Sequence, residues 1–208
     1  MGIGINTGEV VVGNIGSERR AKYGAVGSEI NIAYRIESFT IGGQILICPN
    51  TYDKIRSVVR IKNTKQIQFK GIDHPVAIYD VIAMEDPYAV RLPVKKQEKL
   101  SELNPSLPID CFLLEEKTIS DTAVSGEIIQ LGETVAEAVL KETVEPHANL
   151  RILIAPQENN RLSEVYAKVL SSDDHGYKPS QNSVHLQFTW LPEEIKVYLM
   201  ERRSAGKS

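Results

Sequence analysis

Two side chains set one helical turn apart could act together on an anion. Asn31 and Arg35 are four positions apart in a stretch that favours a helix over residues 29–39. Side chains at this spacing are neighbours on a helix surface. An amide and a guanidinium can then donate to one group, and the Arg fork matches phosphate oxygens. The alternative from the residues alone is a surface pair in which Arg35 bridges to Glu37 or Glu9.

The elements that must position this pair are an expected hairpin before the helix and an apolar face on the helix. Ile3 and Ile5 alternate with small or polar residues, and residues 7–9 supply a tight turn before the β-branched run 10–12. Ser28 is the expected N-cap of the helix. The apolar residues of the helix fall on one face and should point to a core: Ile32, Ala33, Ile36 and Phe39.

Further elements follow the helix and complete a mixed α and β unit. The apolar run 44–48 predicts a buried strand, and residues 52–58 predict a short helix. Residues 59–69 alternate weakly and lead into a hairpin tip at 70–72. The run 76–83 is apolar enough to be a central strand.

The first part of the chain resembles a known enzyme family, the class III adenylate/guanylate cyclases. The resemblance is to the second half of their catalytic domain and is carried by GINTGEVVVGNIGSERRAKYGAVGSEINIAYRIES, GGQILICPNTYDKI and IQFKGIDHPVAIYDV. It implies a partial ferredoxin-like domain over residues 1–84. This domain would act as a homodimer or with another cyclase domain, and would bind ATP or GTP between two subunits. By resemblance, Asn31 orients the ribose and Arg35 stabilises charge on the phosphates.

A third residue, Lys70, stands where the family has a lysine that contacts the triphosphate. A lysine at an exposed hairpin tip is equally well explained as a solubilising residue.

The sequence also departs from the family at two places. The family's two metal-binding aspartates and its purine-contacting lysine precede the matched residues, so the ligands for the expected Mg²⁺ or Mn²⁺ are absent from this chain. In the family the metal activates the 3′-hydroxyl and neutralises the triphosphate, which is the largest electrostatic requirement of phosphoryl chemistry. Gly24 stands where the family carries a base-reading Asp or Thr, so the preference for ATP or GTP is unreadable. We therefore expect the chain to be inactive alone, or Met1 not to be the true start.

Two functions remain open at this point. One is a nucleotidyl cyclase of cyclic nucleotide biosynthesis and signal transduction, in which this chain supplies part of the site. The other is a non-catalytic dimerisation or regulatory module. A domain without its first strands would leave a sheet edge and apolar helix faces uncovered, which favours binding to a partner.

The second half of the chain predicts a small antiparallel barrel. Prolines interrupt residues 85–107, which we interpret as a linker. Residues 108–203 follow as a domain of six short strands and a helix over 192–203. The expected strands are IDCFLLEE, SGEIIQL, VAEAVLKE, NLRILIAP, SEVYAKVLS and SVHLQFTW. The predicted fold class is therefore α+β: a partial ferredoxin-like cyclase domain followed by a six-stranded barrel with a C-terminal helix.

This barrel resembles a PilZ domain in strand order and in its closing F-x-x-L-P-x-E helix. That family binds cyclic di-GMP through an R-x-x-x-R pair and a D-x-S-x-x-G turn. Arg91 and Lys95 have the right separation but lie too far upstream, and residues 130–135 occupy the turn position without Asp or Ser. An alternative frame at 121–126 falls before the strand. The resemblance thus implies a PilZ-like interaction or regulatory module without cyclic di-GMP.

Composition excludes several other classes. Across 208 residues, 42% are hydrophobic and 25% charged, which is typical of a globular protein. The net charge of -3 argues against a nucleic-acid partner. Cys48 and Cys111 have neither disulfide nor metal-ligand spacing, as expected in a reducing cytoplasm. No apolar run reaches the roughly 20 residues of a membrane span.

Overall fold

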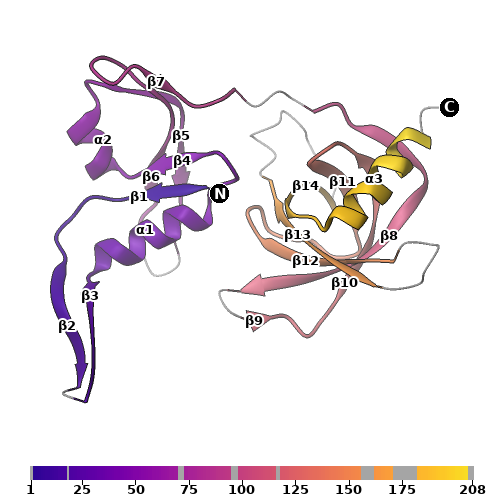
Figure 1. Cartoon of the computed structure of the whole chain (residues 1–208), viewed down its shortest axis with the longest axis horizontal. Helices are drawn as coiled ribbons and strands as arrows, with labels where there is room; N and C mark the ends of the chain where they lie inside the picture. The colour runs from indigo at the N-terminus through magenta and orange to yellow at the C-terminus, as the bar shows by residue number, and fades with distance from the viewer. Residues whose placement is uncertain are drawn as a thin grey trace. The chain divides into compact units, whose positions relative to one another are not determined.

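The protein is described by a computed structural model in two parts (Figure 1). Residue contacts divide the chain into the units Met1–Lys95 and Lys96–Ser208. Within the described ranges, no helix has both the length and the hydrophobicity needed to cross a bilayer. The described residues are 2–17, 19–69, 73–94, 98–115, 118–155, 162–170 and 182–205.

The first unit is built on a sheet of order β1-β4-β6-β5, with β7 added beside β6. β1 and β4 run parallel, and the other neighbours are antiparallel. β6 lies between β4 and β5, which confirms the central strand expected at 76–83. The strands are β1 (Ile3–Ile5), β4 (Ile45–Ile47), β5 (Val59–Ile67), β6 (Val76–Met84) and β7 (Val90–Arg91).

Two helices cover this sheet through two separate apolar clusters. α1 (Ser28–Ser38) buries Ile36 completely against a cluster that includes Ile78. α2 (Pro49–Ile55) packs its own apolar residues on a second cluster around Ile47. Neighbouring strand residues point to opposite faces of a sheet, so Leu46 and Ile47 belong to different clusters. The apolar face predicted for the first helix is therefore confirmed.

Two details of the helices differ from the expectation. α1 begins at Ser28 itself, and Gly27 occupies the cap position without a side-chain hydrogen bond. α2 begins at Pro49 rather than at residue 52, because proline suits the first turn of a helix. The Sγ atom of Cys48 caps α2 by accepting from the Thr51 backbone N–H at 3.3 Å.

The expected hairpin between residues 3–5 and 10–12 is wrong. β1 pairs with β4, while β2 (Val11–Ser17) and β3 (Arg20–Val26) form a separate two-stranded ribbon. Seven residues of β2 face seven of β3, from Val11 opposite Val26 to Ser17 opposite Arg20. This pairing gives a longer hydrogen-bonded ladder than three-residue β1 could offer as a hairpin partner.

The second unit is a closed six-stranded barrel, as predicted. Its order is β10-β11-β14-β13-β12-β8, β10 also pairs with β8, and the short β9 pairs antiparallel with the end of β8. α3 (Glu193–Ala205) follows and buries Ile195 and Leu199. The strands are β8 (Ser101–Glu115), β9 (Thr118–Ile119), β10 (Val124–Leu131), β11 (Val135–Leu140), β12 (Asn149–Ile154), β13 (Ser163–Val169) and β14 (Ser183–Trp190).

β8 starts earlier than its prolines suggested. It begins at Ser101, inside the stretch interpreted as a linker, and it contains Pro105 and Pro108. β12 pairs with β8 only from Ile109 onward, whereas β10 pairs along both halves of β8. The first half of β8 therefore has a strand partner on one side only. A proline, which lacks a backbone N–H, is tolerated where that side of the strand is unpaired.

Candidate functional site

The helix α1 carries both residues of the predicted pair. Asn31 is exposed and Arg35 is partly buried, one turn further along the helix. Ile36, next to Arg35, is fully buried and fixes the rotation of the helix about its axis. The pair consequently lies beside the packed face of α1 rather than opposite it.

α1 is held to the sheet by direct contact with the backbone of β1. A Cβ atom on Gly4 would lie 2.3 Å from the backbone N of Glu37 and 2.8 Å from the Ala33 carbonyl oxygen. Only glycine allows such an approach, because any side chain would occupy the space of the helix backbone. This contact sets the distance between α1 and the sheet, and so the height of Asn31 and Arg35 above it.

A second anchor lies at the start of α1, where no contact was predicted from the sequence. The Asn6 side-chain amide donates to the Glu29 carbonyl oxygen at 2.9 Å and to its Oε2 atom at 2.8 Å. Glu29 lies in the first turn, where the helix dipole favours a carboxylate. The polar residue just after β1 was the available signal for this contact.

The third predicted residue, Lys70, lies outside the described residues. Phe69, the described residue before it, is 2% exposed and meets Phe39 edge-on at 5.5 Å between ring centroids. The structure thus brings Asn31 and Arg35 together on one helix and leaves Lys70 as a prediction.

The described residues do not offer a metal site. Among them, no three His, Cys, Asp or Glu side chains come close enough to hold one ion. Mg²⁺ requires several oxygen ligands in near-octahedral geometry. Mg²⁺ also takes ligands from water and from substrate phosphates.

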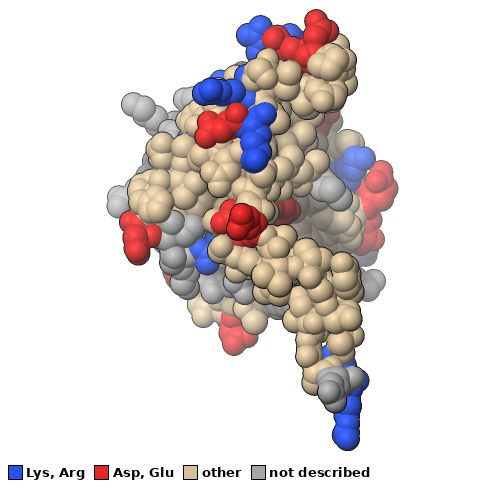
Figure 2. Space-filling model, turned by 90° about the vertical axis from the view of Figure 1, so that its left-hand side faces the viewer, with Lys and Arg blue, Asp and Glu red and all other residues tan. Residues whose placement is uncertain are grey.

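Several apolar side chains of β1 and of the ribbon are exposed. Ile3 and Ile5 of β1 are 44% and 40% exposed, and Val11 and Tyr23 of the ribbon are 75% and 76% exposed. Figure 2 shows the ribbon projecting from its unit, with basic side chains at its far end. An isolated two-stranded ribbon is marginal in water, and exposed apolar clusters mark interaction sites. Val11 and Tyr23 lie on opposite faces of the ribbon, and Ile3 and Ile5 lie on the face of the sheet away from α1. We call these four exposed residues together the open surface.

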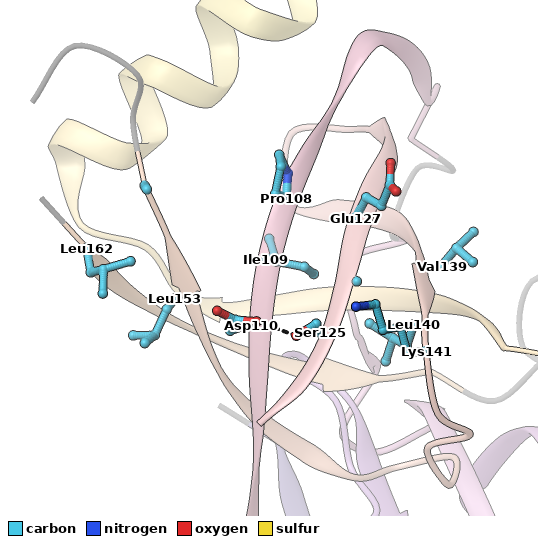
Figure 3. Close-up of a pocket in the computed structure, with 12 residues that line it drawn as sticks. Pro108, Ile109, Asp110, Ser125, Glu127, Val139, Leu140, Lys141, Leu153 and Leu162 are labelled. Carbon is cyan, nitrogen blue, oxygen red and sulfur yellow. Dashed lines mark hydrogen bonds between the residues drawn. The ribbon is translucent and has the colours of Figure 1, made fainter. Parts of the chain in front are cut away.

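The barrel carries a pocket of about 500 Å³ on its outer side (Figure 3). Ser125 donates to Asp110 at 2.7 Å within it, with Lys141 on one side and Leu153 on the other. Asp110 and Lys141 are exposed, so water screens their charges. None of the described lining residues belongs to 130–135, the turn that the sequence singled out.

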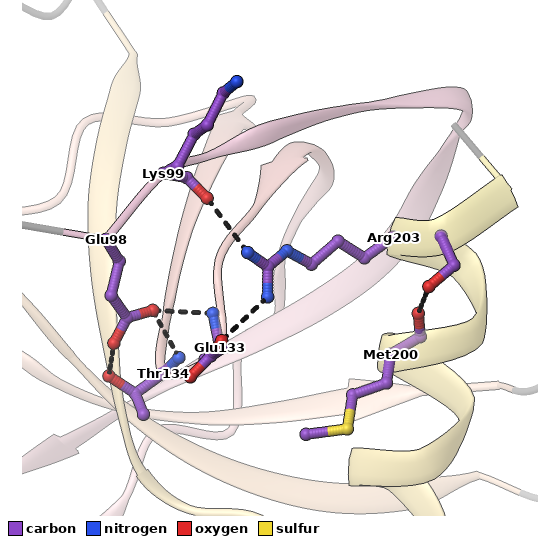
Figure 4. Close-up of polar contacts among 7 residues, drawn as sticks. Glu98, Lys99, Glu133, Thr134, Met200 and Arg203 are labelled. Atoms are coloured by element: carbon purple, nitrogen blue, oxygen red, sulfur yellow. Dashed lines mark hydrogen bonds and ion pairs between the residues drawn. The ribbon is translucent and has the colours of Figure 1, made fainter. Parts of the chain in front are cut away.

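That turn receives a carboxylate from its own chain (Figure 4). The backbone N–H groups of Glu133 and Thr134 donate to Glu98 Oε2 at 2.6 and 2.8 Å. The Thr134 hydroxyl donates to Glu98 Oε1. No sequence pattern indicated this contact, which joins residues 35 or more positions apart.

Comparison with known proteins bears on the first unit. Residues 1–83 match the family model for the adenylate and guanylate cyclase catalytic domain. The resemblance seen in the residues is thereby confirmed for this segment, which we call the cyclase segment.

Curated relatives of the cyclase segment are adenylate cyclases. "Adenylate cyclase 1" of Rhizobium meliloti (strain 1021) is 29% identical over 83 residues, covering 39% of this chain and 12% of that protein. "Adenylate cyclase" of Anabaena cylindrica is 34% identical over 94 residues, covering 40% of this chain and 18% of that protein. The chain thus spans less than a fifth of either relative.

A solved structure is also similar in sequence to part of the chain. The "Crystal structure of the guanylyl cyclase Cya2" is 51% identical, and the likeness covers 43% of this chain and 46% of that chain with a TM-score of 0.41.

Proposed function

We propose that residues 1–84, which are the cyclase segment and Met84, form a partial ferredoxin-like domain that supplies one part of a class III nucleotidyl cyclase site. The reaction converts ATP or GTP to the 3′,5′-cyclic nucleotide and pyrophosphate. The observation that carries the proposal is that Asn31 and Arg35 share α1, which Gly4 and Asn6 fix against β1. A preorganised pair of donors is what charge stabilisation in a transition state requires.

The two side chains have different roles in this proposal. The Asn31 amide donates to a ribose oxygen and orients the sugar, so that its 3′-oxygen faces the α-phosphate. The Arg35 guanidinium donates to phosphate oxygens, where negative charge gathers as pyrophosphate leaves. Lys70 is proposed as a further contact to the triphosphate.

The partner in this proposal is a second cyclase catalytic domain, either another copy or a different chain. The open surface supports this, because Ile3 and Ile5 of β1 and Val11 and Tyr23 of the ribbon expose apolar area. We propose that the Mg²⁺ or Mn²⁺ used by the family is held by the partner domain, since the family's metal-binding aspartates precede the residues that this chain matches.

A complementation assay tests the proposal. The chain is mixed with a metal-competent cyclase catalytic domain whose own counterparts of Asn31 and Arg35 are alanine, and product is measured from ATP and from GTP with Mn²⁺. We expect product only from the mixture, and a loss of about 100-fold or more with Arg35→Ala. Arg56→Ala, at an exposed arginine that follows α2, is the matched control and should leave the rate unchanged.

The same assay distinguishes the cyclase role from the alternative, a non-catalytic dimerisation or regulatory module. The open surface also favours this alternative. A mixture that forms a stable complex by sedimentation and yields no product would support this alternative. Product formation that survives Arg35→Ala would remove the catalytic role of Arg35.

For the second unit we propose a PilZ-like module that does not bind cyclic di-GMP. The support is that the turn at 130–135 lacks the Asp and Ser of the family motif and receives the Glu98 carboxylate instead. A second anion at these donors would meet a like charge. Titration calorimetry with cyclic di-GMP should give no binding heat, and a saturable heat would overturn this part of the proposal.

We propose a cytoplasmic location for both units. Cys48 and Cys111 are free and buried, as is usual in a reducing compartment. Nucleoside triphosphates, the proposed substrates, are intracellular compounds.

A further inference from the structure

A cluster of polar contacts fixes the point where the chain enters the barrel. Glu98 precedes β8 by three positions and sends its carboxylate into the turn between β10 and β11 (Figure 4). Two backbone N–H groups, of Glu133 and Thr134, and the Thr134 hydroxyl all donate to it. Consecutive backbone N–H groups of this kind form a concave anion site.

The turn is shaped to receive this group. A Cβ atom on Gly132 would lie 2.7 Å from Glu98 Oε2, so the absence of a side chain there admits the carboxylate. Gln187 Nε2 donates to the Thr134 Oγ1 atom at 2.9 Å, which leaves the hydroxyl proton directed to Glu98. We call Gly132, Glu133 and Thr134 the anion cradle.

Arg203 of α3 contacts both the turn and the residue that follows Glu98. Its guanidinium donates to the Lys99 carbonyl oxygen at 3.3 Å and pairs with Glu133 at 3.5 Å. The Arg203 side chain is only 18% exposed. Residues 98 and 99 are thereby tied to two elements, the β10–β11 turn and α3.

The carboxylate is charged where it is held. Burial raises the pKa of Glu98, but the hydrogen bonds from Thr134 and Glu133, with the Arg203 charge, outweigh it, so that the pKa is lowered overall. Hydrogen bonds to a charged acceptor are stronger than those between neutral groups. The contact is therefore formed at neutral pH.

The contact can open without disturbing the core. Glu98 is partly exposed, and Glu133 and Thr134 are exposed. The neighbouring Leu131 and Val135 are 1% and 7% exposed and keep the turn packed through apolar contacts of their own. Polar surface contacts of this kind open locally, below the free energy of global unfolding.

We propose that Glu98 is a latch: the chain fills an anion cradle on the barrel with its own carboxylate and so fixes the path of the backbone just before β8. With the latch closed, the chain is bound to the barrel from Glu98 onward. With the latch open, Glu98 leaves the turn, the donors of the anion cradle face solvent, and the Arg203 contact alone holds Lys99.

Hydrogen exchange of the full chain, followed residue by residue by NMR, tests the latch. In Glu98→Ala, the Glu133 and Thr134 amides should exchange at least about tenfold faster, since each loses a charged acceptor. Glu98→Gln keeps the length of the side chain but not its charge and should give a smaller increase. Glu102→Ala, at an exposed glutamate of β8, is the matched control and should change neither amide.

Trypsin provides a second readout, because Lys99 lies within the latched segment. Cleavage after Lys99, identified by fragment mass, should be faster in Glu98→Ala than in the parent chain and the Glu102→Ala control. Unchanged exchange at Glu133 and Thr134 in a folded Glu98→Ala chain would overturn the latch. Faster exchange that extends to the core amides of Ile152 and Leu186 would also overturn it, since Glu98 would then act as a general stabiliser.

Discussion

At the scale of single residues, glycine lets two important contacts form. A Cβ on Gly4 would enter the backbone of α1, and a Cβ on Gly132 would enter the space of the Glu98 carboxylate. Neither position needs a left-handed backbone, so the requirement is for close approach rather than for conformational freedom. The first contact positions Asn31 and Arg35, and the second admits the latch.

Adding one methyl group at Gly4 should weaken the first unit. In Gly4→Ala the new Cβ would lie 2.3 Å from the Glu37 backbone N, so α1 must move away from β1. We expect a loss of about 1–3 kcal/mol in the free energy of unfolding, measured by urea denaturation. Gly13→Ala is the matched control, because nothing lies within 4 Å of its Cβ, and it should change stability little. Equal losses in both variants would contradict this packing.

The Cys111 thiol should be unreactive in the folded barrel. Burial, with the nearby Asp110 charge, raises its pKa to about 12, which suppresses the nucleophilic thiolate. In a Cys48→Ser chain at pH 8, we expect iodoacetamide to label Cys111 only after unfolding. The unfolded thiol ionises near pH 8.5, so the contribution of Cys111 to stability is complete below that pH and is lost as the pH rises toward 12. Rapid labelling of the native chain would contradict this prediction.

At the scale of elements, hydrophobic periodicity predicted those features that depend on residues close together in the sequence. The apolar face of α1 and the six alternating barrel strands were readable, because each pattern reports which side of the element meets a core. The partner of β1 was not readable, since its parallel pairing with β4 joins residues about forty positions apart and leaves no local signal. The same holds for the candidate site: Asn31 and Arg35 follow from helix periodicity, whereas the Asn6 anchor depends on tertiary contact.

The ribbon of β2 and β3 should be needed for association rather than for folding. Val11→Lys places a charge on a side chain that is 75% exposed, so stability should hardly change. If Val11 packs against a partner domain, the Kd measured by sedimentation should rise at least about tenfold. Val94→Lys, at a valine that is 91% exposed outside the ribbon, should leave the Kd unchanged. An equal effect of both variants would indicate non-specific charge repulsion.

At the scale of the whole molecule, each unit has an apolar core of its own. Ile36 belongs to a cluster of the first unit and Ile152 to the barrel cluster, and both are fully buried. Units with separate cores can unfold separately. This separation allows the cyclase segment and the barrel to be tested by independent substitutions.

Calorimetry should resolve the two cores. Ile36→Ala should lower the Tm of one transition and Ile152→Ala the Tm of the other, each through a loss of about 2–5 kcal/mol in the unit that it affects. A single transition shifted by both substitutions would contradict independent units.

Above all, we propose that the cyclase segment contributes Asn31 and Arg35 to a site that a second catalytic domain completes. The most direct measurement is cyclic nucleotide formation at a fixed concentration of the metal-competent partner lacking this pair, titrated with the present chain. We predict a rate that rises from background and saturates at equimolar chain and partner. A rate that stays at the level of the partner alone at every ratio, with the complex demonstrably formed, would contradict this role.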